Sequence, residues 1–454
     1  MADVVLVYPP YQRTMAKRGY SPLGLPYVAS ALERNGRSTV VVDSDVEGFG
    51  VDDITAVIRR ENPSVVGISV FTHTLPEVYR LVNSIKAVSD CEIVVGGPHI
   101  TADPGMTMHL GVGYGIRGEA EREFPKLVEH LLGGSEPADV GGLVESGGDG
   151  FTAKPPCMVA DVDSLPRPAR HLIRTREYKY SVVLSSRGCP YACVYCAEPF
   201  KTVRYRNPVE VVDEVEELAA GYGVREVDFG DSVFTLDREH ALEVCGLMRE
   251  RRLGVRWSCI TRADLVDRQL LSAMRESGCR FVSFGVESGV EAIRFLGGKG
   301  IGDDTMREAF RSCRELGIRT RASMIFGNPG ETVEDMRRSI EFARALKPDY
   351  ALFNVMQIFP GTRIFETAKG EGLVDDNLWV DYMLGARESL DYHPPGVSAE
   401  DVYRVSGEAF RRFYFDWGYI RRKAASVGDF DEVRETLFIL LAKAKVIPID
   451  FQVG

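Results

Sequence analysis

The chain has 454 residues, of which 44% are apolar and 27% are charged, a balance typical of folded proteins and not of disordered ones. Its 55 basic and 66 acidic residues give a net charge of −11, which disfavours broad binding to nucleic acids. No run of about 18 apolar residues occurs and the first residues lack a signal-peptide layout, so we expect a cytoplasmic protein without a membrane span. The nine cysteines are an odd number, which favours reduced thiols over a disulfide framework.

Residues 1–135 alternate short apolar runs with segments of helical periodicity. Strands separated by helices of about 10–15 residues imply βαβ units and a parallel sheet that is covered on both faces. We therefore predict a doubly wound, flavodoxin-like or Rossmann-like α/β domain, whose ligand binds beyond the carboxyl ends of the strands. The five expected strands span residues 3–8, 38–43, 64–70, 92–97 and 114–116.

Glycines and hydroxyl groups follow these predicted strands. Paired glycines such as Gly96 and Gly97 let the backbone approach a bulky ligand, although from the residues alone tight turns explain them equally well. The loops resemble those of the cobalamin-binding domain that precedes many radical SAM (S-adenosylmethionine) enzymes, in the stretches 22–25, 66–69, 96–99 and 117–119. The resemblance implies that cobalamin is bound by Ser69, Thr72, Thr74, Gly96, Gly97, Pro98, Gly118 and Glu119.

One departure from many cobalamin proteins concerns histidine. Those proteins supply a lower cobalt ligand from an Asp-x-His-x-x-Gly loop after the first strand, and here that region contains no histidine. The pattern occurs once, at residues 391–396, but it lies outside the predicted domain and includes two prolines, so we interpret it as coincidence. The resemblance thus implies cobalamin without a protein histidine as lower ligand. His73 and His99, each alone in a turn, are expected to be structural.

A glycine- and proline-rich linker, residues 136–175, precedes a Cys-x3-Cys-x2-Cys motif at Cys189, Cys193 and Cys196. Three thiolates from one loop suit iron–sulfur or zinc. Structural zinc takes four protein ligands, and no fourth cysteine or histidine lies nearby at suitable spacing. The motif therefore favours a four-iron cluster with one iron open to a ligand, over zinc and over a chance group of buried cysteines.

With Tyr195 before its last cysteine, this motif is similar to that of the radical SAM superfamily. Residues 176–390 continue the βα rhythm of a partial (β/α)6 TIM-type barrel, in which strand carboxyl ends face the chemistry. The resemblance implies a 4Fe–4S cluster on the three cysteines and SAM at its open iron, with Asp231 near the ammonium, Arg262 near the carboxylate and Glu287 near the ribose of SAM. Considered one at a time, Asp231 and Glu287 are more commonly explained as solvated or helix-capping side chains. The implied SAM-binding residues are Tyr195, Gly230, Asp231, Arg262, Glu287, Asn328 and Pro329.

Residues 391–454 are predicted to form a small helical C-terminal region. Its aromatic and basic stretch at 411–423 either contacts a substrate or packs as a helix with its basic side chains solvated, and the second interpretation is favoured. Trp379, Tyr382 and Tyr392 are candidates for lining a substrate pocket.

The resemblance to cobalamin-dependent radical SAM enzymes covers residues 1–390. It implies a C-methyltransferase in which a 5′-deoxyadenosyl radical removes hydrogen from an unactivated carbon that then takes a methyl group from methylcobalamin. It also implies a small-molecule or peptide substrate and an electron donor such as flavodoxin or ferredoxin. The first alternative keeps both cofactors but oxidises, cyclises or rearranges its substrate without methyl transfer.

Two further alternatives are disfavoured. A non-catalytic iron–sulfur or cobalamin carrier or sensor would not need the SAM-site candidates found at four strand ends. An RNA-modifying methylthiotransferase shares the cysteine motif, but relatives of that kind resemble a different layout, with three cysteines in an N-terminal domain and a basic tail. Only Cys91 lies in the first domain here, and the chain is acidic.

Overall fold

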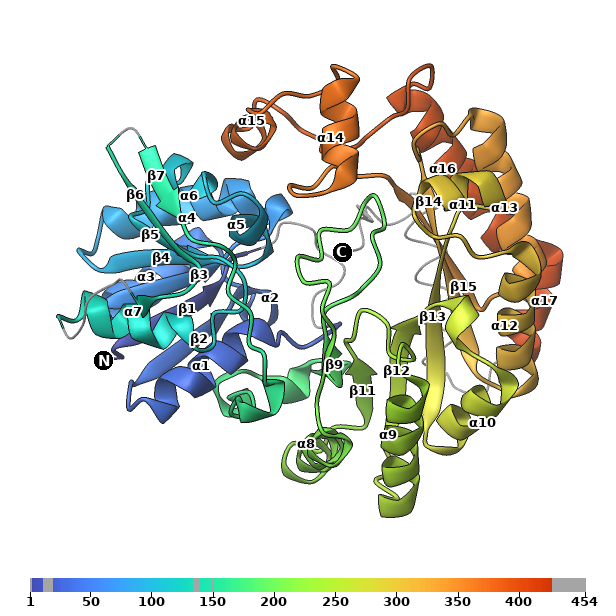
Figure 1. The fold of residues 1–454 in the computed structure, drawn as a ribbon, viewed down its shortest axis with the longest axis horizontal. Helices are drawn as coiled ribbons and strands as arrows, with labels where there is room; N and C mark the ends of the chain where they lie inside the picture. Colours follow the sequence, from blue (N-terminus) through green and yellow to red (C-terminus); the bar gives the residue numbers. More distant parts are fainter. Residues whose placement is uncertain (1, 11–18, 134–138, 149, 427–454) are drawn as a thin grey trace.

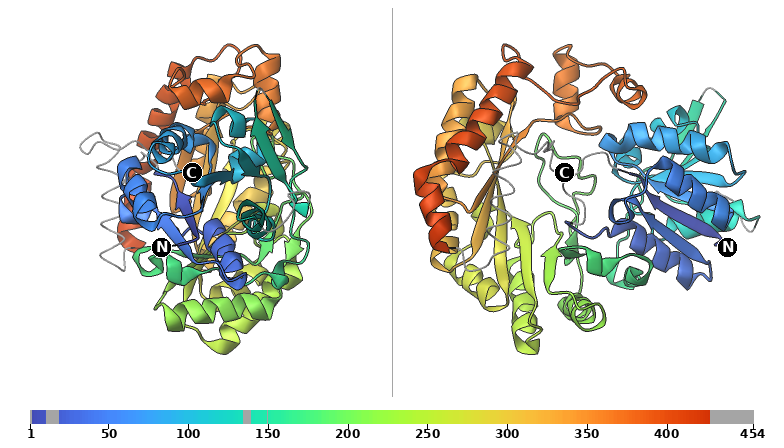
Figure 2. Two further views of the ribbon diagram at one scale, coloured as in Figure 1. Left: turned by 90° about the vertical axis from the view of Figure 1, so that its left-hand side faces the viewer. Right: turned by 180° about the vertical axis from the view of Figure 1, so that it is seen from behind.

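The computed structural model describes residues 2–10, 19–133, 139–148 and 150–426. Two α/β units lie side by side, one built on a seven-stranded sheet and the other on a six-stranded parallel sheet (Figure 1). This is the predicted fold class, with the cysteine loop in the space between the two units (Figure 2). No helix within the described ranges is long and apolar enough to cross a membrane.

The first sheet has the strand order β2-β1-β3-β4-β5-β6-β7. Its five parallel strands are those expected from the apolar runs: β1 (Val4–Tyr8), β2 (Thr39–Asp43), β3 (Val65–Ser69), β4 (Glu92–Gly96) and β5 (Tyr114–Ile116). The antiparallel hairpin of β6 (Leu143–Gly147) and β7 (Gly150–Ala153) extends the sheet beyond β5. This hairpin lies in the segment interpreted as a linker, and it covers the otherwise open edge of β5.

Helices cover both faces of this sheet because alternate residues of the buried strands point to opposite sides. Leu6 packs with α1 and α7 on one face, whereas Val5 and Val7 pack with α3 and α4 on the other. The helices are α1 (Gly24–Arg34), α2 (Ser44–Glu47), α3 (Val51–Glu61), α4 (Leu75–Lys86), α5 (Pro98–Ala102), α6 (Met106–His109) and α7 (Glu123–Leu131).

The second sheet is an incomplete barrel with the order β15-β14-β13-β12-β11-β8, all parallel. Its strands are β8 (Ser181–Val183), β11 (Glu226–Phe229), β12 (Arg256–Thr261), β13 (Cys279–Glu287), β14 (Arg319–Phe326) and β15 (Tyr350–Val355). The helices on its outer face are α8 (Pro208–Gly221), α9 (Arg238–Arg251), α10 (Arg268–Glu276), α11 (Glu291–Leu296), α12 (Asp303–Glu315) and α13 (Val333–Leu346).

The remaining helices are α14 (Arg363–Gly370), α15 (Leu378–Leu384), α16 (Ala399–Tyr414) and α17 (Trp417–Ser426). α15 reaches the first unit, where Trp379 and Met383 join the same core as helix α4 (Figure 1). Phe410 and Phe413 of α16 are buried while Arg411 and Arg412 are exposed, which is the favoured interpretation of the aromatic and basic stretch. The part of the predicted helical region at 427–454 lies outside the described residues.

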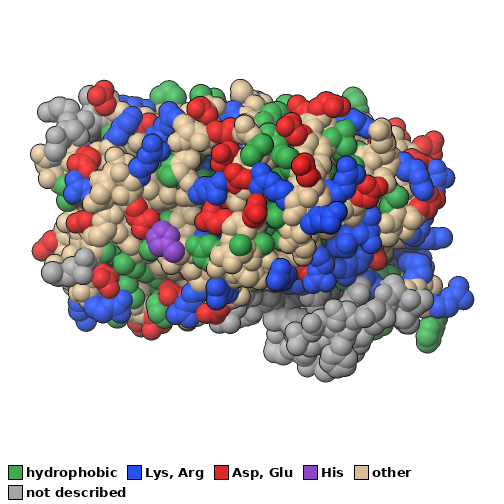
Figure 3. All heavy atoms as spheres, turned by 90° about the horizontal axis from the view of Figure 1, so that it is seen from below, with side chains coloured by type: hydrophobic (Ala, Val, Ile, Leu, Met, Phe, Trp, Pro, Cys, Tyr) green, Lys and Arg blue, Asp and Glu red, His purple; other side chains and the backbone are tan. Residues whose placement is uncertain are grey.

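The charge of −11 does not collect into one acidic surface on the face seen in Figure 3, because acidic and basic side chains are interspersed there. Basic side chains gather toward one end of that face.

Candidate active site

The cysteine loop leaves and rejoins a two-stranded antiparallel ribbon of β9 (Ser186–Arg187) and β10 (Arg204–Tyr205). The Cys189 N–H donates to the Phe200 carbonyl at 3.0 Å, which closes the loop at its base. Gly188 is required beside it, since its φ is +91° and a Cβ there would meet the Thr202 carbonyl oxygen at 2.4 Å. The Cys189 side chain is buried, Cys193 is half-buried and Cys196 is exposed.

The Cys196 thiol responds to the two other thiols of the loop. Burial raises the pKa of Cys196, and the nearby thiols of Cys193 and Cys189 raise it further. Within the described part of the chain, no three or more His, Cys, Asp or Glu side chains are gathered so as to hold one metal ion. Three ligands of a four-iron cluster bind three different irons, so they stand further apart than the ligands of one ion. The three thiols of the loop fit a 4Fe–4S cluster, with one thiol for each of three irons.

Two other segments hold the cysteine loop in place. The Val194 N–H donates to the Gly297 carbonyl at 3.1 Å, and the Val194 carbonyl accepts from the Ile364 N–H at 2.9 Å. Gly298, with φ of +80°, lies so close that a Cβ would be 2.8 Å from the Ala192 carbonyl oxygen. The turn after α11 and the start of α14 thus set the loop position. Sequence reasoning did not identify these contacts, whose only local signal is the glycine pair.

Glu287 ends β13 in an unusual conformation. Its φ is +65°, and the pairing with β14 shifts register between Gly285 and Glu287. Its carboxylate accepts a hydrogen bond from Lys299 Nζ at 2.8 Å, and a Cβ on Gly285 would lie within 2.2 Å of both partners. A positive φ at a residue other than glycine costs about 1–3 kcal/mol and is typical of functional sites.

Tyr195 joins Glu287 to the cysteine loop. Burial raises the pKa of the Tyr195 hydroxyl, and its hydrogen bonds with Glu287 and Cys193 raise it further. Two of the predicted SAM-binding residues therefore meet beside Cys193, one of the three predicted cluster ligands. Lys299, which completes this group, was not predicted.

Asp231 is fully enclosed. Its carboxylate accepts hydrogen bonds from the Ser185 N–H at 3.1 Å and from the hydroxyls of Ser185 and Ser186 at 2.8 and 2.5 Å. Burial nevertheless raises its pKa. In this structure Asp231 fixes the strand end that leads into the cysteine loop, and its predicted contact with the ammonium of SAM stays a prediction. Gly230 packs against Val182, because a Cβ on Gly230 would be 2.6 Å from Val182 Cγ1.

Arg262 faces the cysteine loop. Its guanidinium lies 3.9 Å from the centre of the Tyr191 ring and donates two hydrogen bonds to Asp264, at 2.9 and 2.7 Å. A carboxylate of SAM would therefore compete with Asp264 for this guanidinium.

Asn328 and the half-buried Pro329 belong to the turn after β14, which is organised by the buried Glu331. One carboxylate oxygen of Glu331 accepts from the Gly327 N–H at 2.9 Å, the Asn328 N–H at 3.0 Å and Asn328 Nδ2 at 3.1 Å. Ser288 Oγ donates to its other oxygen at 3.3 Å. Glu331 thus joins the end of β13 to that of β14, and it was absent from the predicted SAM-binding set.

We predict that Glu331→Gln makes stability less dependent on pH. Burial raises the pKa of Glu331 from 4.5 to about 7, so the folded protein binds this proton more tightly than the unfolded chain does. The resulting stabilisation is complete below the unfolded pKa and is lost as the pH rises through 7, by up to about 3 kcal/mol. Urea unfolding between about pH 5 and 8 should show this loss in the unsubstituted protein and a flatter profile in Glu331→Gln. Glu334→Gln, at an exposed position, is the control, and an unchanged slope in Glu331→Gln contradicts the prediction.

A cavity of about 210 Å³ opens among the carboxyl ends of the first sheet and the helices α1 and α7. Gly67 and Gly97 line it without side chains, and close packing requires a glycine at both positions: a Cβ on Gly67 would be 2.7 Å from Leu6 Cδ2, and one on Gly97, whose φ is +96°, would be 3.0 Å from the Val70 backbone. This glycine-lined cradle fits part of a bulky ligand such as cobalamin. The predicted cobalamin-binding residues that line it are Ser69, Gly96, Gly97, Gly118 and Glu119.

The other three residues of that set do not line this cavity. Thr74 Oγ1 donates to the Phe71 carbonyl at 2.9 Å, Thr72 Oγ1 lies 3.0 Å from His99 Nδ1, and Pro98 begins α5. His99 is completely buried, and burial lowers its pKa to about 3, so its ring is neutral.

The three candidate substrate residues lie in or against one buried core. Trp379 is only 3% exposed and packs its ring at 5.9 Å from that of His99, at the contact between the two units. Tyr392 is 1% exposed and donates its hydroxyl to Glu371 at 2.8 Å. Tyr382 is half-buried against the same core. Trp379 and Tyr392 are thus buried in this structure, and the contact of the three residues with a substrate stays a prediction.

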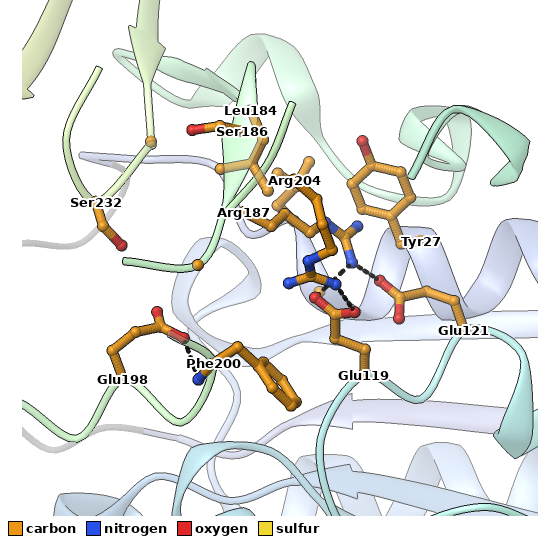
Figure 4. A pocket seen from close by; sticks show the side chains of 14 residues that line it. Tyr27, Glu119, Glu121, Leu184, Ser186, Arg187, Glu198, Phe200, Arg204 and Ser232 are labelled. Carbon is orange, nitrogen blue, oxygen red and sulfur yellow. Dashed lines mark hydrogen bonds and ion pairs between the residues drawn. The ribbon is translucent and has the colours of Figure 1, made fainter. Parts of the chain in front are cut away.

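A second cavity, of about 290 Å³, lies between the first unit and the ribbon that carries the cysteine loop (Figure 4). Arg187 Nη1 donates to Glu121 at 2.7 Å, and Arg204 Nη1 donates to Glu119 at 2.5 Å. Tyr27 lies beside them, its ring centre 4.8 Å from the Arg187 guanidinium. These ion pairs join the two units at the base of the cysteine loop.

Comparisons with known proteins agree with this architecture. Residues 183–343 match the model of the radical SAM superfamily, and residues 15–128 match that of the B12 binding domain. An uncharacterized methyltransferase of Pyrococcus horikoshii is 31% identical over 427 residues, which span 90% of this chain and 92% of that protein. The cytidylyl-2-hydroxyethylphosphonate methyltransferase of Streptomyces wedmorensis is 26% identical, over 86% of each chain.

A solved structure shares the whole fold. The radical S-adenosylmethionine methyltransferase TsrM from Kitasatospora setae, with cobalamin and a 4Fe–4S cluster bound, superposes with a TM-score of 0.77 at 20% identity, over 98% of this chain and 100% of that one.

The cysteine loop, the incomplete barrel and the cobalamin-type sheet are those of one class of enzymes, and the chain belongs to the cobalamin-dependent radical SAM family. Its cofactors are a 4Fe–4S cluster, SAM and cobalamin, which confirms the prediction. Within that family it is a methyltransferase.

Proposed function

We propose that the enzyme methylates an unactivated carbon of a small molecule, and that the contact between its two units is where this happens. When bound, the cluster supplies an electron that cleaves SAM, and cobalamin supplies the methyl group. The protein orients these cofactors and keeps water from the reacting carbon. We also propose a cytoplasmic location and a flavodoxin or ferredoxin as electron donor.

One observation supports this proposal above the others: the two candidate cofactor sites adjoin. Gly24, Glu119 and Glu121 line both the glycine-lined cavity of the first sheet and the cavity at the base of the cysteine loop. The second cavity is also lined by Arg187 and Gly188, directly before Cys189. Cobalamin in the first cavity and a cluster on the loop would therefore be neighbours, as transfer to a radical carbon requires.

The individual residues have distinct proposed roles. Cys189, Cys193 and Cys196 hold the cluster. Tyr195 and Glu287 form one wall of the SAM site, and Lys299 orients the Glu287 carboxylate through their ion pair. Asp231 holds Ser185 and Ser186 so that the loop begins at a fixed position.

The test uses the full chain reconstituted anaerobically with iron and sulfide and supplied with cobalamin and SAM that carries a trideuterated methyl group. We expect about four irons and one cobalamin per chain, and a labelled methyl group on the recovered cobalamin after reduction. Four irons without cobalamin, even after it is supplied, would overturn the methyl-transfer proposal and leave the radical SAM core standing. Once a substrate is known, a product in which one hydrogen is replaced by the labelled CD3 group distinguishes methylation from oxidation or cyclisation.

A further inference from the structure

Three of the residues that line the cavity at the base of the cysteine loop carry buried polar atoms for which the described residues offer no hydrogen-bond partner. These are Glu121 Oε2, Arg204 Nε and Nη2, and Arg187 Nε. Glu121 and Arg204 are each 7% exposed, and both line the cavity (Figure 4). Buried polar atoms are nearly always hydrogen-bonded in folded proteins, because an unpaired one has lost its contact with water and gained nothing in exchange. Three such residues at one cavity offer unused donors and acceptors to a polar group of a ligand.

The chemistry of these atoms defines the ligand group. Glu121 Oε2 only accepts hydrogen bonds, whereas the guanidinium atoms of Arg187 and Arg204 only donate them. The charges already balance, because each guanidinium is paired with a carboxylate: Arg187 with Glu121 and Arg204 with Glu119. A neutral group that donates and accepts at once satisfies both, and a primary carboxamide is such a group. A phosphate or carboxylate would instead face the unpaired Glu121 oxygen.

The location of the cavity points to the source of that carboxamide. It shares Gly24, Glu119 and Glu121 with the glycine-lined cavity of the first sheet. Cobalamin is far larger than either cavity, so a molecule bound at the first must extend beyond it. The rim of its corrin ring carries several acetamide and propionamide side chains. Leu23 and Leu184 provide apolar surface around the polar atoms, as is typical of pockets that orient a ligand through a few polar groups.

We propose that Glu121 and Arg204 bind a carboxamide side chain of cobalamin, with the amide N–H donating to Glu121 Oε2 and the amide oxygen accepting from Arg204 Nη2. The cobalamin site is then completed by the radical SAM unit, because Arg204 belongs to the ribbon at the base of the cysteine loop. Cobalamin binding thereby fixes the position of the cluster loop relative to the first sheet. The inference concerns binding of the cofactor and holds whatever group the enzyme transfers.

The test measures cobalamin binding by the reconstituted full chain, without turnover. The probes are aquacobalamin and its monocarboxylic acid derivatives, in which a single side-chain amide is hydrolysed to a carboxylate. We expect one derivative to bind at least 10-fold more weakly than aquacobalamin, because its carboxylate faces Glu121. Glu121→Gln should reduce this discrimination to about 3-fold or less, and Arg204→Met should weaken binding of intact aquacobalamin about 10-fold.

Two controls separate this binding role from a general loss of structure. Glu92→Gln and Arg249→Gln, at exposed positions away from the cavity, should bind all probes as the unsubstituted protein does. The iron content of every variant should stay unchanged. Equal binding of all the acid derivatives and of aquacobalamin by the unsubstituted protein would overturn the proposal, and this result needs no variant to fold. Unchanged discrimination in a folded Glu121→Gln protein would overturn it as well.

Discussion

Replacing Cys193 with alanine is expected to abolish SAM cleavage and methyl transfer, by at least about a thousandfold in rate. The loop supplies three thiols and no fourth side chain, so removing one leaves two ligands for a cluster that needs three. Cys193 is also the cluster cysteine that lies beside Tyr195 and Glu287, so its loss reaches the SAM site directly. Cys189→Ala and Cys196→Ala should have the same effect, because the ligands act as a unit.

Iron content and formation of 5′-deoxyadenosine from SAM with a chemical reductant are the measurements for this prediction. The matched control is Cys91→Ser, which changes a half-buried thiol of the first unit and should keep full iron content and activity. Turnover by a Cys193→Ala protein at the unsubstituted rate would contradict the assignment of the cluster and restore the carrier or sensor alternative.

Most of the fold could be predicted because a parallel strand that is buried on both faces consists of consecutive apolar residues, which can be recognised in the sequence. Val4–Tyr8 and Val65–Ser69 are such runs, and both are central strands in the structure. The hairpin of β6 and β7 was missed, because its glycines resemble those of a linker and its role in covering β5 is visible only in three dimensions. The domain boundaries at residues 135, 175 and 390 stay predictions.

The candidate site also has a part that the sequence predicts and a part that it does not. The cysteine motif is local, so its spacing was enough to predict a cluster. The partners of Glu287 and Arg187 are not local: Lys299 is 12 residues from Glu287, and Glu121 is 66 residues from Arg187. No spacing rule pairs such residues. The burial of Trp379 and Tyr392 could not be predicted for the same reason. For Trp379 it depends on the contact of α15 with the first unit, and the Tyr392 hydroxyl donates to the distant Glu371.

The pair of Glu287 and Lys299 allows a second large effect to be expected. Each side chain is only 10% exposed, so removing one partner leaves the other charge buried without compensation. Such a change costs about 3–5 kcal/mol, whereas replacing both partners costs less. We therefore expect Lys299→Met to lower the free energy of unfolding by about 3 kcal/mol, and the double variant Glu287→Gln with Lys299→Met to recover part of that loss.

Binding of SAM should respond differently from stability. If Glu287 contacts SAM as proposed, Glu287→Gln and the double variant should both bind SAM about 10- to 100-fold more weakly than the unsubstituted protein. The double variant should do so even though it is more stable than the Lys299→Met single variant. Lys299→Arg, which keeps the charge, should retain most of the affinity. Urea unfolding and equilibrium dialysis with labelled SAM measure the two quantities separately. If the double variant instead binds SAM as tightly as the unsubstituted protein does, Glu287 acts only by neutralising Lys299. The left-handed backbone at Glu287 would then serve the ion pair and not the cofactor.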